Sequence, residues 1–164
     1  MKGDAYERPL FRCTAEERER ILSILQEVLT ARGDVLFAYV YGSFEEGSRF
    51  HDIDVGVYLT EGCDREDLWI DVELAEYLEQ AVWQAQIACR PGRNKGVRRP
   101  RIPVDVRVLN KAPTTFGYHV LRGRLLFSRD ESIRVSWTAR IVSRYLDLKP
   151  LRHAALKEAM ISWD

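Results

Sequence analysis

Residues 36–59 read LFAYVYGSFEEGSRFHDIDVGVYL, and this stretch decides how the chain is interpreted. It opens with an apolar run over 36–41, the pattern of a buried strand, which runs into the turn Gly42-Ser43. A polar segment follows. From Asp52 to Leu59 apolar side chains then alternate with others, which predicts a second strand. The stretch therefore predicts a strand–turn–strand unit.

Two carboxylates stand at the start of the second strand. Asp52 and Asp54 are two residues apart, so they share one face of the strand with Cα atoms roughly 6.5–7 Å apart. Neighbouring carboxylates repel each other, and a divalent cation between them removes the repulsion. Oxygen ligands with open positions left over favour Mg²⁺ bridging to phosphates. The pair is therefore a candidate magnesium site.

A third carboxylate, Asp105, lies in a strand predicted over 104–109 by its β-branched residues at alternate positions. If that strand pairs beside the second strand, three carboxylates converge at one end of the sheet. Two-metal phosphoryl transfer needs this arrangement, in which one ion activates the attacking oxygen and the other stabilises the leaving group.

The turn Gly42-Ser43 is a candidate phosphate site. Glycine lets the backbone approach a phosphate closely, and serine offers a hydroxyl and an N–H. A helix that begins at Ser43 would add free N–H groups to the same site.

The remaining chain is predicted to be mostly helical. Thr14 and Glu17 have the spacing of a capping box and open a first helix that stops near Gly33. Further helices are expected over 64–88, 113–122, 130–146 and 151–162, with Lys149-Pro150 between the last two, and a fourth strand over 124–127. Residues 1–12 are expected to be a loosely ordered lead-in.

Composition limits the class of protein. The 164 residues fit one domain, and 25 basic residues balance 25 acidic ones, so net charge favours neither a nucleic-acid nor a membrane partner. No apolar run approaches the ~18 residues that span a bilayer. The three cysteines are Cys13, Cys63 and Cys89. Their odd number and wide spacing argue against a zinc site and a disulfide framework, and favour a reducing cytoplasm.

Two other features can be interpreted as structural or as functional. The stretch 89–101 holds six basic residues and is expected to be a solvated loop, the alternative being a docking surface for RNA, a partner or triphosphate oxygens. His51 precedes Asp52 and points to the other face of the strand. It is interpreted as structural or as a loop contact, and His119 as structural.

The motifs together resemble a known family. Gly42-Ser43, eight residues, and Asp52-Ile53-Asp54 look like the signature of the polymerase-β-type nucleotidyltransferases. The blocks Val104-Asp105-Val106-Arg107-Val108-Leu109-Asn110, Ala112-Pro113, Leu121-Arg122-Gly123-Arg124-Leu125-Leu126-Phe127 and Arg144-Tyr145-Leu146-Asp147-Leu148-Lys149-Pro150 resemble the minimal nucleotidyltransferases called MNT, or MntA-like, proteins. The resemblance covers residues 15–150.

The resemblance implies an α/β (α+β) fold, a small mixed β-sheet with helices packed on one face. It implies a single domain over 1–164, with a core over 15–130 and C-terminal helices over 130–162. It further implies transfer of AMP from ATP with two Mg²⁺ ions. Gly42 and Ser43 would hold the triphosphate, Asp52 and Asp54 would bind the metals, and Asp105 would bind a metal or act as the base.

The loop after the Gly-Ser turn departs from the family. Members usually have Ala-Arg-Gly where this chain has Glu45-Glu46-Gly47, and the gap before the first aspartate is often ten residues rather than eight. Arg49 is therefore the candidate for the triphosphate contact that a loop arginine would make. The basic stretch 89–101 is also longer than the usual link before the third aspartate.

Many family members are antitoxins of a HEPN-type toxin, and some place AMP on a tyrosine of that toxin. The resemblance therefore implies a protein acceptor. Only 131–164 follow the core, which also favours a protein acceptor over a small molecule, since aminoglycoside adenylyltransferases usually carry a larger second domain. The remaining alternative is a non-catalytic binder that blocks its partner sterically. Nucleic acid is not expected as a direct substrate, and an oligomer is possible.

Overall fold

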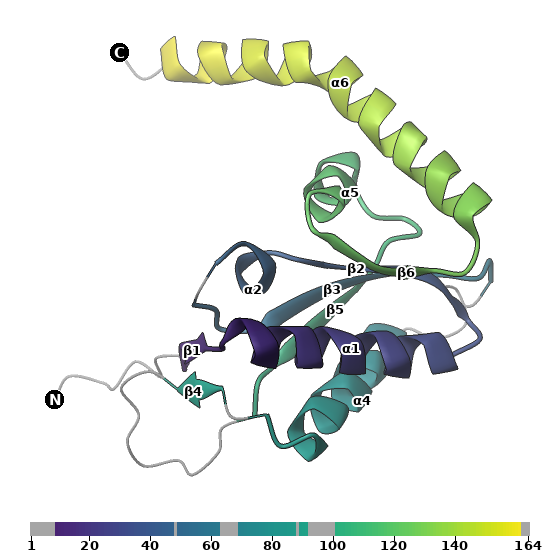
Figure 1. Ribbon diagram of the computed structural model, residues 1–164. Helices are drawn as coiled ribbons and strands as arrows, with labels where there is room; N and C mark the ends of the chain where they lie inside the picture. Colours follow the sequence, from purple (N-terminus) through teal and green to yellow (C-terminus); the bar gives the residue numbers. More distant parts are fainter. Residues whose placement is uncertain (1–8, 48, 63–68, 88, 92–100, 162–164) are drawn as a thin grey trace, which may run out of the picture.

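A four-stranded mixed sheet forms the centre of the computed structural model (Figure 1), which describes residues 9–47, 49–62, 69–87, 89–91 and 101–161, without the side chains of 90–91 and 152–161. The strand order is β5-β3-β2-β6. These strands span Val104–Val108 (β5), Ile53–Leu59 (β3), Val35–Tyr41 (β2) and Arg124–Ser128 (β6). β2 runs antiparallel to both β3 and β6, whereas β3 and β5 are parallel. The expected mixed α+β class and all four strands of this sheet are confirmed.

One face of the sheet carries the larger core. Alternate residues of β3, from Ile53 to Leu59, are fully buried here against helices α1 (Ala15–Ala31) and α4 (Ile70–Gln84). Thr14 caps α1 through the predicted capping box, in which Thr14 and Glu17 each bond the other's backbone N–H. The helical stripe and cap predicted from the sequence therefore position α1 as expected.

Helices cover the other face as well, rather than the one face expected. The aromatic side chains of Phe37, Tyr39 and Tyr41 pack there against α5 (Thr114–Leu121) and against Trp137 and Ile141 of α6 (Glu131–Ile161). Figure 1 shows α5 and the start of α6 on the side of the sheet opposite α1 and α4. Asp54 of β3 and Asp105 of β5 lie on this second face. The candidate site is therefore beside α5.

Two predictions about the chain ends are wrong. α6 continues through Pro150 as one helix, bent along its length (Figure 1), where two helices were expected. Near the other end, Phe11–Arg12 forms a short strand, β1, that pairs antiparallel with β4 (Arg90–Pro91). Phe11 is fully buried, so burial orders the end of the expected loose lead-in. The basic stretch therefore begins in a strand, and its residues 92–100 lie outside the described residues.

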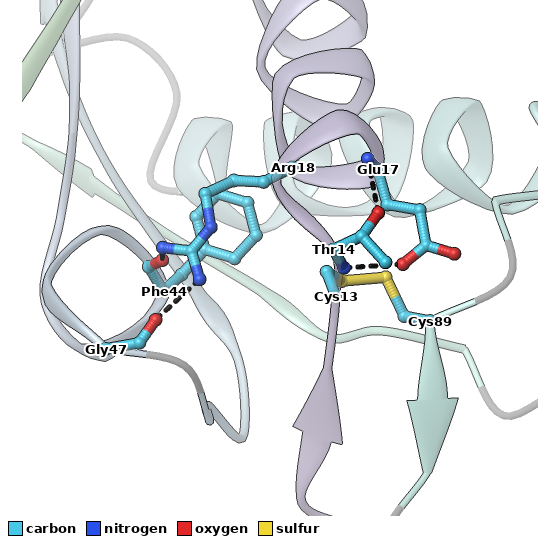
Figure 2. The surroundings of a disulfide bond; sticks show 7 residues. All are labelled: Cys13, Thr14, Glu17, Arg18, Phe44, Gly47 and Cys89. Carbon is cyan, nitrogen blue, oxygen red and sulfur yellow. Dashed lines mark hydrogen bonds between the residues drawn. A yellow bond between two sulfur atoms is a disulfide. The ribbon is translucent and has the colours of Figure 1, made fainter.

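A disulfide joins the two segments that carry this small sheet. Cys13 and Cys89 are bonded with their Cα atoms 4.7 Å apart (Figure 2), although the sequence argued against a disulfide. Spacing alone could not reveal the pair, because pairing of β1 with β4 brings the two cysteines together. Cys63 lies outside the described residues. The expectation of a reducing compartment rested on unpaired cysteines and loses that support. None of the described helices has the length and apolarity to cross a bilayer.

Reduction of this disulfide should lower stability substantially. The bond closes a separation of 76 residues, and a disulfide typically stabilises the folded chain by roughly 2–4 kcal/mol. We expect a reductant to lower the melting temperature by on the order of 10 °C, measured by scanning calorimetry. A Cys63→Ser variant retains only Cys13 and Cys89, and should respond to the reductant as the wild type does. A melting temperature unaffected by reductant would contradict the pairing.

Candidate active site

The turn after β2 places a glycine directly against a carboxylate. Gly42 has φ +74°, in the region that favours glycine, and α2 (Ser43–Glu46) begins immediately after it. A Cβ on Gly42 would lie less than 3.0 Å from Oδ2 of Asp54, closer than real Cβ atoms approach a neighbour. Glycine is therefore required here both for the backbone conformation and for the close approach to Asp54. The expected helix start at Ser43 is present.

The strand register brings two of the three predicted aspartates side by side. Asp54 and Asp105 are partners in the parallel β3–β5 pair, and Tyr41 is the partner of Asp54 on β2. Because side chains alternate along a strand, Asp54 and Asp105 share the face that α5 partly covers. Asp52 directly precedes Ile53, the first residue of β3. The condition on which convergence depended, that the third strand pairs beside the second, is met.

The electrostatics of this edge follow from the concentration of negative charge. Burial raises the pKa of Asp54 to about 6, and the nearby Asp52 and Asp105 carboxylates contribute to that rise, against smaller opposing effects of His119 and Arg107. The pKa of Tyr41 is also raised, first by burial and then by the carboxylates of Asp54, Asp105 and Asp52, with Arg107 opposing them. Repulsion of this kind is what a bound cation relieves, so the donor set fits a divalent metal ion.

The three aspartates are not drawn together around a single point. Among the described residues, the one group of three whose ligand atoms lie within 4.8 Å of one another is Cys13, Glu17 and Cys89. Its two sulfur atoms are already bonded to each other, which removes the thiolates that a metal would need. A spread set of carboxylates suits a pair of ions, whose separation is ~3.5–4 Å, better than one tightly enclosed ion.

Two hollows meet at the aspartates. The larger, about 830 Å³, is lined by Asp54, Asp105 and Arg107 together with side chains from β2, the β5–α5 link and α5. The smaller, about 540 Å³, is lined by His51, Asp52, Asp105 and Arg107, with Pro9 and Pro103. Asp105 and Arg107 thus border both hollows, and Asp52 and Asp54 border one each. Ligands in the two hollows would therefore both border the carboxylate of Asp105.

Sequence reasoning missed several residues around these hollows. Arg107 forms an ion pair with Asp105, with Nη2 3.2 Å from Oδ2, and alternation along β5 could have revealed that it shares the face of Asp105. His119, interpreted from the sequence as structural, lines the larger hollow with Tyr41 and Phe116 and contributes to the electrostatics of Asp54. No sequence signal places it there, because the packing of α5 on the sheet decides it. His51 makes the expected loop contact, with Nδ1 3.1 Å from the Pro9 carbonyl oxygen.

The predicted triphosphate residues occupy the adjoining turn. Ser43 and Arg49 are exposed, and neither they nor Gly42 line the two hollows. Gly42 reaches the site through its contact with Asp54. The turn therefore borders the cavity at Asp54, and the role of Arg49 stays a prediction.

Comparison with known proteins places the chain in a family. The model of the family "Polymerase beta, Nucleotidyltransferase" matches residues 23–132, more than half of the chain, and this match includes all three aspartates. The chain belongs to the polymerase beta nucleotidyltransferase family. No curated protein matches the sequence.

Solved structures with the same fold come from toxin–antitoxin complexes. A chain of a mutant MntA–HpeT complex is 20% identical, with TM-score 0.59, covering 87% of this chain and 98% of that one. A chain in the structure of tri-AMPylated Shewanella oneidensis HEPN toxin with MNT antitoxin is 20% identical, with TM-score 0.56, covering 88% and 97%. A chain in the structure of a toxin–antitoxin with AMP-PNP is 21% identical, with TM-score 0.58, covering 87% of this chain and 98% of that one. At these identities the likeness shows a shared fold.

Proposed function

We propose that this chain transfers AMP from ATP to a hydroxyl group of a partner protein, as the antitoxin of a HEPN/MNT-type toxin–antitoxin module. The observation that carries the proposal is the edge at which Gly42 abuts Asp54, and Asp54 pairs in register with Asp105. The neighbouring structures support it, since one contains a tri-AMPylated HEPN toxin with its MNT antitoxin and another contains AMP-PNP.

Two Mg²⁺ ions would be held by Asp52, Asp54 and Asp105, because their half-buried carboxylates offer negatively charged oxygen donors. Bound magnesium would supply neutralisation of the phosphate charge that develops during transfer. Arg107 already neutralises part of the charge on Asp105, so its guanidinium must yield or share that carboxylate when the site is filled.

The chain's own residues would bind and orient the reactants. Gly42 and Ser43 would hold the triphosphate through backbone and hydroxyl groups, with Arg49 as a further cation. The larger hollow has the size of a nucleotide site. In the transfer, the acceptor oxygen forms a bond to the α-phosphorus, the bond from that phosphorus to the bridging oxygen breaks, and pyrophosphate leaves. Asp105, which borders both hollows, would accept the proton of the acceptor hydroxyl.

A protein acceptor fits the exposed surface of α6. This helix exposes several apolar side chains, with Leu146 and Leu151 more than half exposed. Large exposed apolar patches mark interaction sites, and protein–protein interfaces are among them. A docked protein would also hold its hydroxyl in line with the α-phosphate, which supplies the positioning that transfer needs.

ATP with magnesium should raise the melting temperature of the chain, because a ligand that binds only the folded state stabilises it. The Asp52→Asn, Asp54→Asn double variant should keep its fold and lose most of that shift. Thermal denaturation with and without ATP and Mg²⁺ measures both effects. An equal shift in the double variant would show that ATP binds elsewhere.

The class of acceptor is tested by labelling reactions with each candidate acceptor. In parallel reactions, the chain is incubated with labelled ATP, Mg²⁺ and either a HEPN-type protein or a panel of aminoglycosides. We expect label on the protein. Label on aminoglycosides alone would replace the protein acceptor with a small-molecule one, and complex formation without any label would leave a steric antitoxin.

A further inference from the structure

The short helix α2 turns its last backbone carbonyls toward a donor on another helix. Its internal bonds run from the N–H groups of Glu45 and Glu46 to the Gly42 carbonyl, and from the Gly47 N–H to the Ser43 carbonyl. These bonds occupy the carbonyls at its start. The carbonyls of Phe44, Glu45 and Gly47, at its end, accept no bond from a backbone N–H of the described residues, as at the end of any helix.

Arg18, one turn into α1, supplies the missing donors. Its Nη1 donates to the Phe44 carbonyl and to the Glu45 carbonyl (3.2 Å), and its Nη2 donates to the Gly47 carbonyl (2.5 Å). Its Cζ also lies 5.1 Å from the centre of the Phe44 ring (Figure 2). A planar guanidinium presents several donors in a fixed fork, which a lysine ammonium cannot reproduce on three carbonyls.

The start of α1 is itself firmly held. The capping box closes at Thr14, and the disulfide at Cys13 binds the preceding residue to Cys89 (Figure 2). Phe11 stacks on Phe50, and Phe50 packs edge-on against Phe44, so a buried aromatic row joins β1 to α2. Arg18 therefore joins the 42–47 turn to a frame that is covalently closed and packed.

We propose that Arg18 is a positioning residue of the nucleotide site. It fixes the far end of the 42–47 turn and thereby holds Gly42 and Ser43 at the correct distance from Asp54. Arg18 does not touch the nucleotide in this arrangement. This inference rests on the proposed function, in which Gly42 and Ser43 hold the triphosphate.

The test is the affinity for AMP-PNP with Mg²⁺, measured by titration calorimetry without any acceptor. We expect Arg18→Ala to weaken binding on the order of tenfold, because the released turn must be ordered again each time the nucleotide binds. Arg18→Lys, which keeps the charge and the aliphatic stem, should fall between wild type and Arg18→Ala. In transfer assays Arg18→Ala should raise KM for ATP and leave kcat within about threefold, since the turn binds ground and transition states alike.

Arg20→Ala is the matched control, because Arg20 is an exposed arginine on the same helix, and it should bind AMP-PNP as the wild type does. Circular dichroism and the melting temperature establish that each variant is folded; if Arg18→Ala is not, Arg18→Lys carries the test. Wild-type affinity in Arg18→Ala, or full affinity in Arg18→Lys, would overturn the inference and leave the proposed function intact. A wild type that binds no AMP-PNP would overturn both.

Discussion

Asp54→Asn is expected to lower the rate of AMP transfer by roughly 10³-fold or more, while the chain stays folded. Asp54 stands between Gly42 and Asp105, so the turn and the neighbouring aspartate both border this carboxylate. Asparagine keeps the shape of the side chain and removes its charge, and with it a ligand of the metal ions. Initial rates with labelled ATP and the partner protein measure the loss. Glu27→Gln, an exposed change on α1 outside both hollows, serves as the control and should retain full activity.

The same substitution should not weaken the fold in the absence of metal. Because the pKa of Asp54 is raised from 3.8 to about 6, the folded chain binds a proton more tightly than the unfolded chain does. Titration of Asp54 therefore lowers the stability of the wild type relative to that of Asp54→Asn as the pH rises from 3.8 toward about 6. Denaturation in EDTA across this pH range should show the free energy of unfolding of the variant rising relative to that of the wild type. A variant that is less stable at neutral pH would mean that Asp54 has a stabilising partner.

Gly42→Ala is the second change with a large expected effect. A methyl group at this position would lie less than 3.0 Å from Oδ2 of Asp54, and the φ of +74° disfavours any side chain. We expect AMP transfer to fall on the order of 100-fold, because Asp54 must move, and the free energy of unfolding to fall by about 1–2 kcal/mol. Rates and denaturant unfolding of the same preparation measure the two effects.

Two other glycines serve as controls that separate the effect of backbone conformation from the effect of the contact with Asp54. Gly62 has φ +100°, and a methyl group there would meet no atom within 4 Å, so Gly62→Ala should show the backbone effect without loss of activity. Gly33 also has open space around it, and its φ lies outside the left-handed region, so Gly33→Ala should change neither quantity. If Gly42→Ala retained activity like these two, the contact with Asp54 would not matter for transfer.

The strands that carry the candidate site could be predicted from the sequence because the local signals and the long-range pairing agree. Apolar runs and alternation predicted β2, β3 and β5 within a residue or two, and the parallel register then placed Asp105 opposite Asp54. The capping box at Thr14 is a local hydrogen-bond pattern and was equally readable.

What the sequence did not reveal depends on tertiary packing. Proline disfavours a helix interior, so Pro150 was taken as a break, although α6 continues through it. The Cys13–Cys89 bond and the burial of Phe11 exist only because β1 meets β4. Likewise His119 reaches the site through the packing of α5, and Arg18 reaches α2 across 26 to 29 residues of sequence.

AMP transfer to a partner protein must raise the mass of that partner. The HEPN-type partner is incubated with ATP, Mg²⁺ and this chain, and its intact mass is then measured. We predict a mass gain of one or more AMP groups, which requires Mg²⁺ and is absent with Asp54→Asn. An unchanged partner mass, with wild type and Asp54→Asn neutralising the partner equally well, would contradict the claim.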